Sequence, residues 1–267
     1  MNYIKSIKYD ESLVRDKIMG PNPLKLNEEL LLNHRIPQNA VVMDLGSGQG
    51  LTSVFLVKEY GFRVYAVDLW SDPDENRKFF EEMNLSPEQI TPVQAEATQL
   101  PFENEFFDAV VSTDSYNYFG YDPQYLDSCL LPFVKPNGYL YIVIPGMKKD
   151  CHHSIPPELL LSWTPEQLDY LHDIEYWSKI LQQCRNAHCI SIYEMKSNEE
   201  CWNDWLACEN EYAVNDRKSM NAGGGKYLNF IAIILQKKTA LNNGPIPAET
   251  VEQDCKSPKV KKLAKVQ

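Results

Sequence analysis

The chain has no long hydrophobic run, no signal-like start and no redox motif. No stretch of about 18 consecutive apolar residues occurs, so no transmembrane helix is predicted. The first ten residues, MNYIKSIKYD, lack the apolar core of a signal peptide. The seven cysteines form no C-x-x-C motif, and their odd number is typical of reduced thiols. We therefore expect a cytoplasmic protein without a disulfide framework.

Positive charge is also scarce. The 26 lysines and arginines are outnumbered by 37 acidic residues, which gives a net charge of −11. A negative field repels polyanions, so we expect neither a general nucleic-acid binder nor a protein of anionic membranes. A chain of 267 residues with 43% hydrophobic residues can bury a sizeable core, most simply as one domain with additions.

The most specific pattern is VVMDLGSGQG, residues 41–50. A run of β-forming residues ends in Asp44, and a helix-like segment, 51–59, begins after the glycines. The intervening turn contains Gly46, Ser47, Gly48 and Gly50. This order predicts a strand, a tight turn and a helix start, with room for a ligand against the backbone. The next strand-like run ends in Asp68, where an acid can bond to the hydroxyls of a ribose.

The glycine spacing distinguishes between nucleoside cofactors. Dinucleotide folds carry G-x-G-x-x-G, which lets a helix start hold a pyrophosphate. Here the spacing is G-x-G-x-G, and Asp44 stands two residues before the first glycine. An acid at this place repels a pyrophosphate but suits an ammonium group. The pattern therefore favours S-adenosylmethionine (SAM), which has an ammonium group and no phosphate.

These residues resemble a known family. DLGSGQG is similar to the first motif of class I SAM-dependent methyltransferases, D-x-G-x-G-x-G, and Asp68 ends the second strand as expected there. Three further segments match in order: QAEATQLPF (94–102), FFDAVVSTDSYNYF (106–119) and LLPFVKPNGYLYIV (130–143). The resemblance covers roughly residues 40–145. Together with GPNPLKL, GLTSVFLVKEYG and DSYNYFG, it resembles a bacterial branch of small-molecule methyltransferases.

The resemblance implies a set of cofactor contacts. Asp44 lies near the methionine ammonium, the glycines approach the cofactor, and Asp68 holds the ribose. Leu69 or Trp70 lies against the adenine, while Glu96 stands where the family usually has an aspartate that accepts from the adenine amino group. The full predicted set is Asp44, Gly46, Ser47, Gly48, Gly50, Asp68, Leu69, Glu96, Ala97 and Asp114. The product is S-adenosylhomocysteine.

Catalytic candidates follow the fourth and fifth strands. Asp114 is interpreted as a base, a cofactor contact or a helix cap, and Tyr118 as a contact of the methyl group or a core residue. His152 is interpreted as a base or a pocket-lining residue. No metal site is expected, because the adjacent histidines His152 and His153 rarely bind one ion together. N-methyltransferases that act on amides and bases carry Asn/Asp-Pro-Pro-Tyr here, and STDSY at 112–116 argues against that class.

The acceptor side is rich in aromatic residues. Trp163, Tyr176, Trp177, Trp202 and Trp205 are interpreted mainly as core, with an aromatic-lined acceptor pocket as the alternative.

Strand and helix patterns alternate through the middle of the chain. Strands are predicted at 41–45, 63–67, 91–94, 107–112, 138–144, 188–195 and 227–238, the last two as an edge pair. Helices are predicted at 22–34, 51–60, 73–83, 122–133 and 199–215. We expect an α/β fold: a doubly wound, mostly parallel, seven-stranded Rossmann-like sheet with helices on both faces.

The predicted domain order is an N-terminal helical lid at 1–39, a SAM-binding domain at 40–238 and a disordered tail at 239–267. The domain contains a helical acceptor-side insertion at about 146–187, in which Thr164 caps the second helix. The tail ends with five lysines among its last twelve positions.

The resulting functional hypothesis is transfer of a methyl group from SAM to a small-molecule acceptor by in-line displacement. One alternative is a lipid-modifying enzyme of the cyclopropane fatty-acid synthase type. Others are a non-catalytic SAM-binding protein and a methyltransferase for a thiophilic acceptor such as arsenite. The sequence leaves the acceptor atom and the oligomeric state open.

Overall fold

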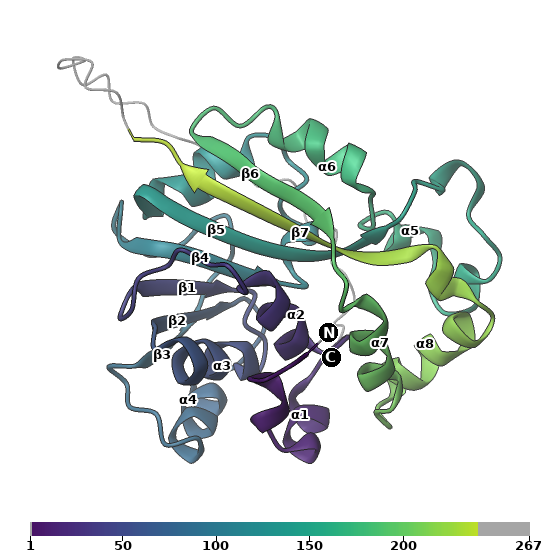
Figure 1. Ribbon diagram of the computed structural model, residues 1–267, viewed down its shortest axis with the longest axis horizontal. Helices are drawn as coiled ribbons and strands as arrows, with labels where there is room; N and C mark the ends of the chain where they lie inside the picture. The colour runs from purple at the N-terminus through teal and green to yellow at the C-terminus, as the bar shows by residue number, and fades with distance from the viewer. Residues whose placement is uncertain (1, 240–267) are drawn as a thin grey trace.

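The protein is built around a seven-stranded sheet, described for residues 2–239 in a computed structural model (Figure 1). The strand order is β3-β2-β1-β4-β5-β7-β6. The strands are β1 (Val41–Leu45), β2 (Arg63–Asp68), β3 (Ile90–Gln94), β4 (Phe107–Thr113), β5 (Val134–Met147), β6 (Ala187–Glu194) and β7 (Leu228–Lys237). β1 to β5 pair in parallel, and β7 pairs antiparallel with both β5 and β6. The predicted fold class and the edge pair are confirmed.

Two hydrophobic clusters cover the two faces of the sheet. Val42 and Met43 of β1 belong to different clusters, as expected when successive side chains of a strand point to opposite faces. One cluster contains buried residues of α2 (Pro23–Leu30), α3 (Leu51–Tyr60) and α4 (Pro73–Glu82). The other contains Trp177 and Leu181 of α6 (Ile174–Leu181). Helices on both faces leave the carboxyl ends of the parallel strands open for a site.

Two buried acids of α2, Glu28 and Glu29, hold the N-terminal segment and the start of α7 (Asn198–Leu206) to this helix. This segment comprises a 3₁₀ turn, Ser6–Lys8, and α1 (Glu11–Lys17). The Glu28 carboxylate accepts hydrogen bonds from the backbone N–H groups of Ile4, Lys5 and Ser6 at 2.7–2.9 Å. The Glu29 carboxylate accepts from the N–H groups of Lys196 and Ser197, at 2.9 and 2.8 Å. Because Ser197 is the N-cap of α7, α2 connects the N-terminal segment to α7, and Figure 1 shows α2 between α1 and α7.

Three predicted helices differ from those observed. The helix expected at 22–34 ends at Leu30. The helix expected at 122–133 is a π-helical turn, Leu126–Leu130, followed by the 3₁₀ turn Leu131–Phe133, because Pro132 has no N–H to continue a helix. The helix expected at 199–215 is in fact two: α7, and α8 (Glu211–Asn221), whose N-cap Asn210 accepts from the N–H of Ala213.

The insertion after β5 is helical, as expected. Thr164 forms a capping box with Gln167 at the start of α5 (Pro165–Leu168). Asp173 caps α6 by accepting from the N–H of Tyr176. Two 3₁₀ turns, His152–Ser154 and Leu159–Leu161, precede these helices.

Helices that could cross a membrane, being long and apolar enough, do not occur between residues 2 and 239. The six cysteines in this part of the chain are not joined in disulfides. Apart from its first residue, the predicted tail lies outside the described residues.

Candidate cofactor-binding site

The glycine turn lies at the carboxyl edge of the sheet, between β1 and β2. The N–H groups of Gly46 and Ser47 donate to the carbonyl oxygen of Val67 at 2.8 and 3.1 Å, which fastens the turn to β2. Gly46, Gly48 and Gly50 have φ angles of 81°, 52° and 83°. A Cβ atom at Gly46 would lie 2.1 Å from Ser115 Oγ, and one at Gly50 would lie 2.4 Å from the Phe80 ring. Ser115 and Phe80 already fill the space that a Cβ atom would take at Gly46 and Gly50, so packing as well as the φ angles requires glycine in this turn.

Asp44 is fully buried beside this turn. Its Oδ2 atom accepts hydrogen bonds from Thr52 Oγ1 and Ser53 Oγ, both at 2.6 Å. Its Oδ1 atom is buried and has no hydrogen-bond partner within residues 2–239. Burial, with a smaller contribution from the charge of Asp68, raises the pKa of Asp44 to about 6 against the effect of the two hydroxyls. A buried acceptor without a partner is costly, so Asp44 fits a cationic or hydrogen-bond-donating ligand group.

Asp68 contacts the same turn from the end of β2. Its Oδ2 atom accepts from the N–H of Gly48 at 2.9 Å, and its Oδ1 atom accepts from the N–H groups of Trp70 and Ser71 at 2.8 and 2.9 Å. A carboxylate offers about four acceptor positions, so Asp68 keeps capacity for a ligand hydroxyl. Asn76 Nδ2 donates to the Gly48 carbonyl oxygen at 3.0 Å. No motif pointed to Asn76, which lies in the first turns of α4.

The predicted adenine contacts surround the end of β2. Leu69 and Trp70 are 39% and 73% exposed, which is unusual for large apolar side chains and suits a ring-binding surface. The N–H of Ala95 donates to the Asp68 carbonyl oxygen at 3.0 Å and brings the segment of Glu96 alongside. Glu96 Oε1 accepts from Thr98 Oγ1 at 2.9 Å, and the Ala97 carbonyl oxygen accepts from Tyr125 Oη at 3.0 Å.

The N-terminal segment reaches the centre of the site. A Cβ atom at Gly48 would lie 3.3 Å from Met19 Sδ, and one at Gly20 would lie 2.7 Å from Asp114 Oδ2. Residues 19 and 20 therefore lie between the glycine turn and the segment after β4. The sequence pattern predicted a lid here but gave no indication of these contacts.

Asp114 has a left-handed backbone conformation, with φ of 56°, and its N–H donates to the Val143 carbonyl oxygen at 2.8 Å. Burial, and then the negative charge of Asp216, raise the pKa of Asp114 to about 7. Asp216 belongs to α8 and accepts from Trp205 Nε1 at 2.9 Å. Sequence reasoning missed Asp216, because the single predicted helix at 199–215 ended before it.

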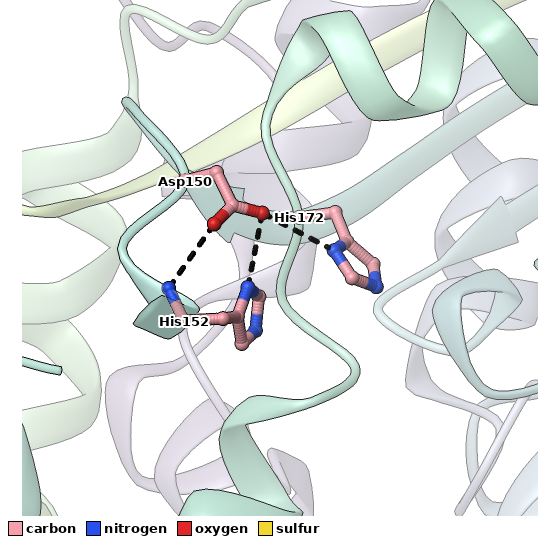
Figure 2. Close-up of side chains that lie close together, drawn as sticks. All are labelled: Asp150, His152 and His172. Atoms are coloured by element: carbon pink, nitrogen blue, oxygen red, sulfur yellow. Dashed lines mark hydrogen bonds and ion pairs between the residues drawn. The ribbon is translucent and has the colours of Figure 1, made fainter. Parts of the chain in front are cut away.

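Tyr118 and His152 lie farther along the same edge. The Tyr118 side chain is 49% exposed, and its ring centroid is 5.2 Å from that of Tyr170. His152 belongs to a separate cluster with Asp150 and His172, shown in Figure 2. No hydrogen bond or ring contact within the described chain joins His152 to Asp114.

The aromatic residues of the insertion and of α7 are mainly core, as the simpler interpretation held. Trp177, Trp202 and Trp205 are at most 8% exposed. Tyr176 is an exception to simple packing, because its ring stacks on that of His172 with centroids 3.5 Å apart.

A groove of about 590 Å³ lies elsewhere, between the segment after α2 and strands β5, β6 and β7. Leu32, Tyr139 and Ile190 are among its lining residues. It contains none of the predicted site residues, and we assign the chemistry to the strand ends because the buried Asp44 and the glycine turn lie there.

Comparison with known proteins agrees with this geometry. Residues 43–142 match the family described as "Methyltransferase domain". The chain is 32% identical over 85 residues to a sarcosine/dimethylglycine N-methyltransferase of Aphanothece halophytica, which covers 32% of this chain and 30% of that protein. The chain spans less than two fifths of the length of the curated relatives it matches.

Two solved structures share the fold. One is geranyl diphosphate C-methyltransferase of Streptomyces coelicolor A3(2), in complex with Mg²⁺, geranyl diphosphate and S-adenosyl-L-homocysteine. Its TM-score is 0.61 at 15% identity, with 80% of this chain and 78% of that chain covered. The other is the cyclase SpnF, with a TM-score of 0.63, 12% identity and 81% of both chains covered. Likeness at this level shows the fold alone.

Fold and sequence match together define the class. Residues 43–142 match a methyltransferase domain, and the chain shares its Rossmann-like fold with solved methyltransferase structures.

Proposed function

We propose that this protein is a SAM-dependent methyltransferase that acts on a small-molecule acceptor. The observation that carries the proposal is the buried Asp44 with its unpartnered Oδ1 atom, placed directly before the glycine turn. A pyrophosphate would be repelled by Asp44, whereas an ammonium group would supply the missing hydrogen-bond donor. The matched methyltransferase domain, residues 43–142, supports the same cofactor.

The residues fit SAM along its length. Asp44 would receive the ammonium group, Asp68 the ribose hydroxyls, and Leu69 with Glu96 and Ala97 the adenine. When bound, SAM supplies a methyl group on a positively charged sulfur, which needs mainly correct positioning of an acceptor. Met19 and Gly20 lie across the site between Gly48 and Asp114, where they would exclude water from the transfer.

An amine is the first acceptor to test. Asp114 and Asp216 place two acidic groups on the acceptor side, and each raises the local preference for a positive charge. Because burial and Asp216 raise the pKa of Asp114 to about 7, its carboxylate can take up the proton that an ammonium acceptor loses. The exposed Tyr118 ring offers a face for cation–π contact. The matched Aphanothece halophytica relative is named as a sarcosine/dimethylglycine N-methyltransferase.

An acceptor screen tests the proposal. The full chain is incubated with methyl-labelled SAM and pools of small amines, carboxylates, phenols and thiols, and products are identified by mass. The expected result is one small molecule heavier by a methyl group, with an equal amount of S-adenosylhomocysteine. The Asp68→Ala variant serves as the control for cofactor dependence.

Two outcomes would overturn the proposal. Label found only in the acyl chains of added phospholipid vesicles would favour the lipid-modifying alternative. Tight SAM binding without any transfer across the pools would favour a non-catalytic SAM-binding protein.

A further inference from the structure

A cluster of two histidines and one aspartate lies beyond the proposed cofactor site. Asp150 follows β5, His152 begins a 3₁₀ turn, and His172 directly precedes the N-cap of α6. One potential ligand atom from each residue lies within 4.8 Å of the other two. Figure 2 shows both imidazole rings directed toward the Asp150 carboxylate.

The hydrogen bonds of His152 require a cation in this cluster. His152 Nε2 lies 3.0 Å from the Leu168 carbonyl oxygen, which can only accept, so Nε2 carries the proton. His152 Nδ1 lies 3.0 Å from Asp150 Oδ2, which is also an acceptor when ionised. Either a second proton or a metal ion must therefore stand between Nδ1 and the carboxylate.

His172 favours the metal ion over the proton. Its Nδ1 atom is buried and has no hydrogen-bond partner in the described chain, and it lies 3.9 Å from Asp150 Oδ2. That distance is too long for a hydrogen bond. It is suitable for two atoms that share one metal ion, since bonds of about 2.0–2.2 Å place ligand atoms roughly 3–4 Å apart. Stacking on Tyr176 with an interplanar angle of 14° fixes the His172 ring in this orientation.

We propose that Asp150, His152 and His172 bind one divalent metal ion of the first transition series or Zn²⁺, and that Zn²⁺ is the ion to test first. Two imidazole nitrogens with one carboxylate favour Zn²⁺ and its neighbours over Mg²⁺ and Ca²⁺, which prefer oxygen ligands. The ring N–H of His152 is oriented by the Leu168 carbonyl oxygen, as is usual for metal-binding histidines. Three protein ligands leave a position open, and the Asp150 side chain is 40% exposed, so water or a ligand can reach the ion.

The ion would join two segments that flank the acceptor side. The N–H of Met147, at the end of β5, already donates to the His172 carbonyl oxygen at 3.1 Å. Tyr170, two residues before His172, packs on Tyr118. One ion coordinated by His172, Asp150 and His152 would thus fix the wall of the proposed acceptor site. This proposal departs from the expectation of no metal site, which considered only the adjacent His152 and His153, whereas the proposed partner of His152 is His172.

Metal binding is tested on the full chain after treatment with a chelator. Calorimetric titration with ZnCl₂ at pH 7.5 is expected to give one ion per chain, and MgCl₂ is expected to give no binding. The variants Asp150→Asn and His172→Ala should each weaken Zn²⁺ binding about 100-fold or more, since second-shell changes alone cost 10–100-fold. His153→Ala is the matched control, because His153 is exposed and outside the cluster, and it should bind Zn²⁺ like the wild type.

Cobalt substitution distinguishes this site from the cysteines. The Co²⁺ form should show visible bands of nitrogen and oxygen ligation, without the intense near-ultraviolet bands of thiolate bonds. Circular dichroism of the near-isosteric Asp150→Asn variant confirms that the fold persists. Absence of Zn²⁺ binding by the wild type, unchanged binding in both cluster variants, or thiolate bands would each overturn the proposal. The first result would identify the cluster as an Asp150–His152 ion pair.

Discussion

The Asp44→Asn substitution tests the role of the buried acid, because it should make the protein more stable and a poorer binder at once. The substitution removes the negative charge and keeps the size of the side chain. The remaining amide oxygen can still accept from Thr52 Oγ1 and Ser53 Oγ. Only the buried charge and the free acceptor capacity of the second oxygen are lost.

The magnitude follows from the pKa. Burial raises the pKa of Asp44 from 3.8 to about 6, and each unit corresponds to about 1.4 kcal/mol. The folded state therefore favours the protonated acid, and stability falls as the pH rises from about 4 to about 6. Above this range the charge costs roughly 3 kcal/mol at most, and weaker hydrogen bonds to the amide reduce the gain. We expect Asp44→Asn to stabilise the protein by about 1–3 kcal/mol at pH 7.5.

Binding should change in the opposite direction. A charge-assisted hydrogen bond to an ammonium group contributes about 1.5–3 kcal/mol, so SAM affinity should fall roughly 10–100-fold. In the wild type, SAM affinity should also rise with pH through about 6, as Asp44 ionises, and this dependence should disappear in the variant.

Urea unfolding and calorimetric titration with SAM, both from about pH 5 to 8, measure the two effects. Asp108→Asn is the matched control. Asp108 lies at the start of β4, at the amino ends of the parallel strands, and its Oδ2 atom accepts from the N–H of Val41 at 2.8 Å. This variant should lose some stability and keep SAM affinity. A wild-type affinity for SAM retained by Asp44→Asn would refute the assignment of the ammonium group to Asp44.

Three further substitutions test the surroundings of the site. Gly48→Ala should abolish measurable SAM binding at a stability cost of about 1–2 kcal/mol. Gly61→Ala is the control, because Gly61 has a φ of 71° and no atom within 4 Å, so this variant should lose similar stability and bind SAM normally. Equal SAM binding by both variants would contradict the close approach of the cofactor to Gly48. If the Asp114 carboxylate takes the proton from the acceptor, kcat/KM of the wild type should rise with pH through about 7. Asp114→Asn should remove this ionisation from the pH profile. An unchanged profile would exclude this role of Asp114. Glu28→Gln should destabilise the protein by roughly 2–4 kcal/mol, because the amide places a donor against backbone N–H donors. Burial alone would raise the pKa of Glu28, but these N–H groups hold it below its usual value. The stabilisation by Glu28 should therefore be present at neutral pH and vanish in acid. A difference in urea unfolding between wild type and Glu28→Gln that stays constant at all pH values would contradict this.

The sheet and the glycine turn could be predicted because their information is local. Residues 41–50 specify a strand, a turn and a helix start within ten positions, and the order of strands and helices follows from parallel topology. The break between α7 and α8 was missed, although Asn210 is a common N-cap residue, because no glycine or proline marks it.

Contacts between distant segments could not be predicted from spacing. Met19 and Gly20 reach Gly48 and Asp114 because Glu28 fixes the N-terminal segment, and nothing in the order of residues specifies that pairing. His172 lies beside His152 only because the insertion folds back along the end of β5. A search for neighbouring histidines in the sequence therefore fails to identify the cluster.

Calorimetric titration of the wild-type full chain with SAM, S-adenosylhomocysteine and NADH tests the central claim most directly. We predict micromolar binding of both adenosyl ligands, none of NADH, and loss of adenosyl binding in Asp68→Ala. Folded protein that binds neither adenosyl ligand would contradict the assignment of this site to SAM.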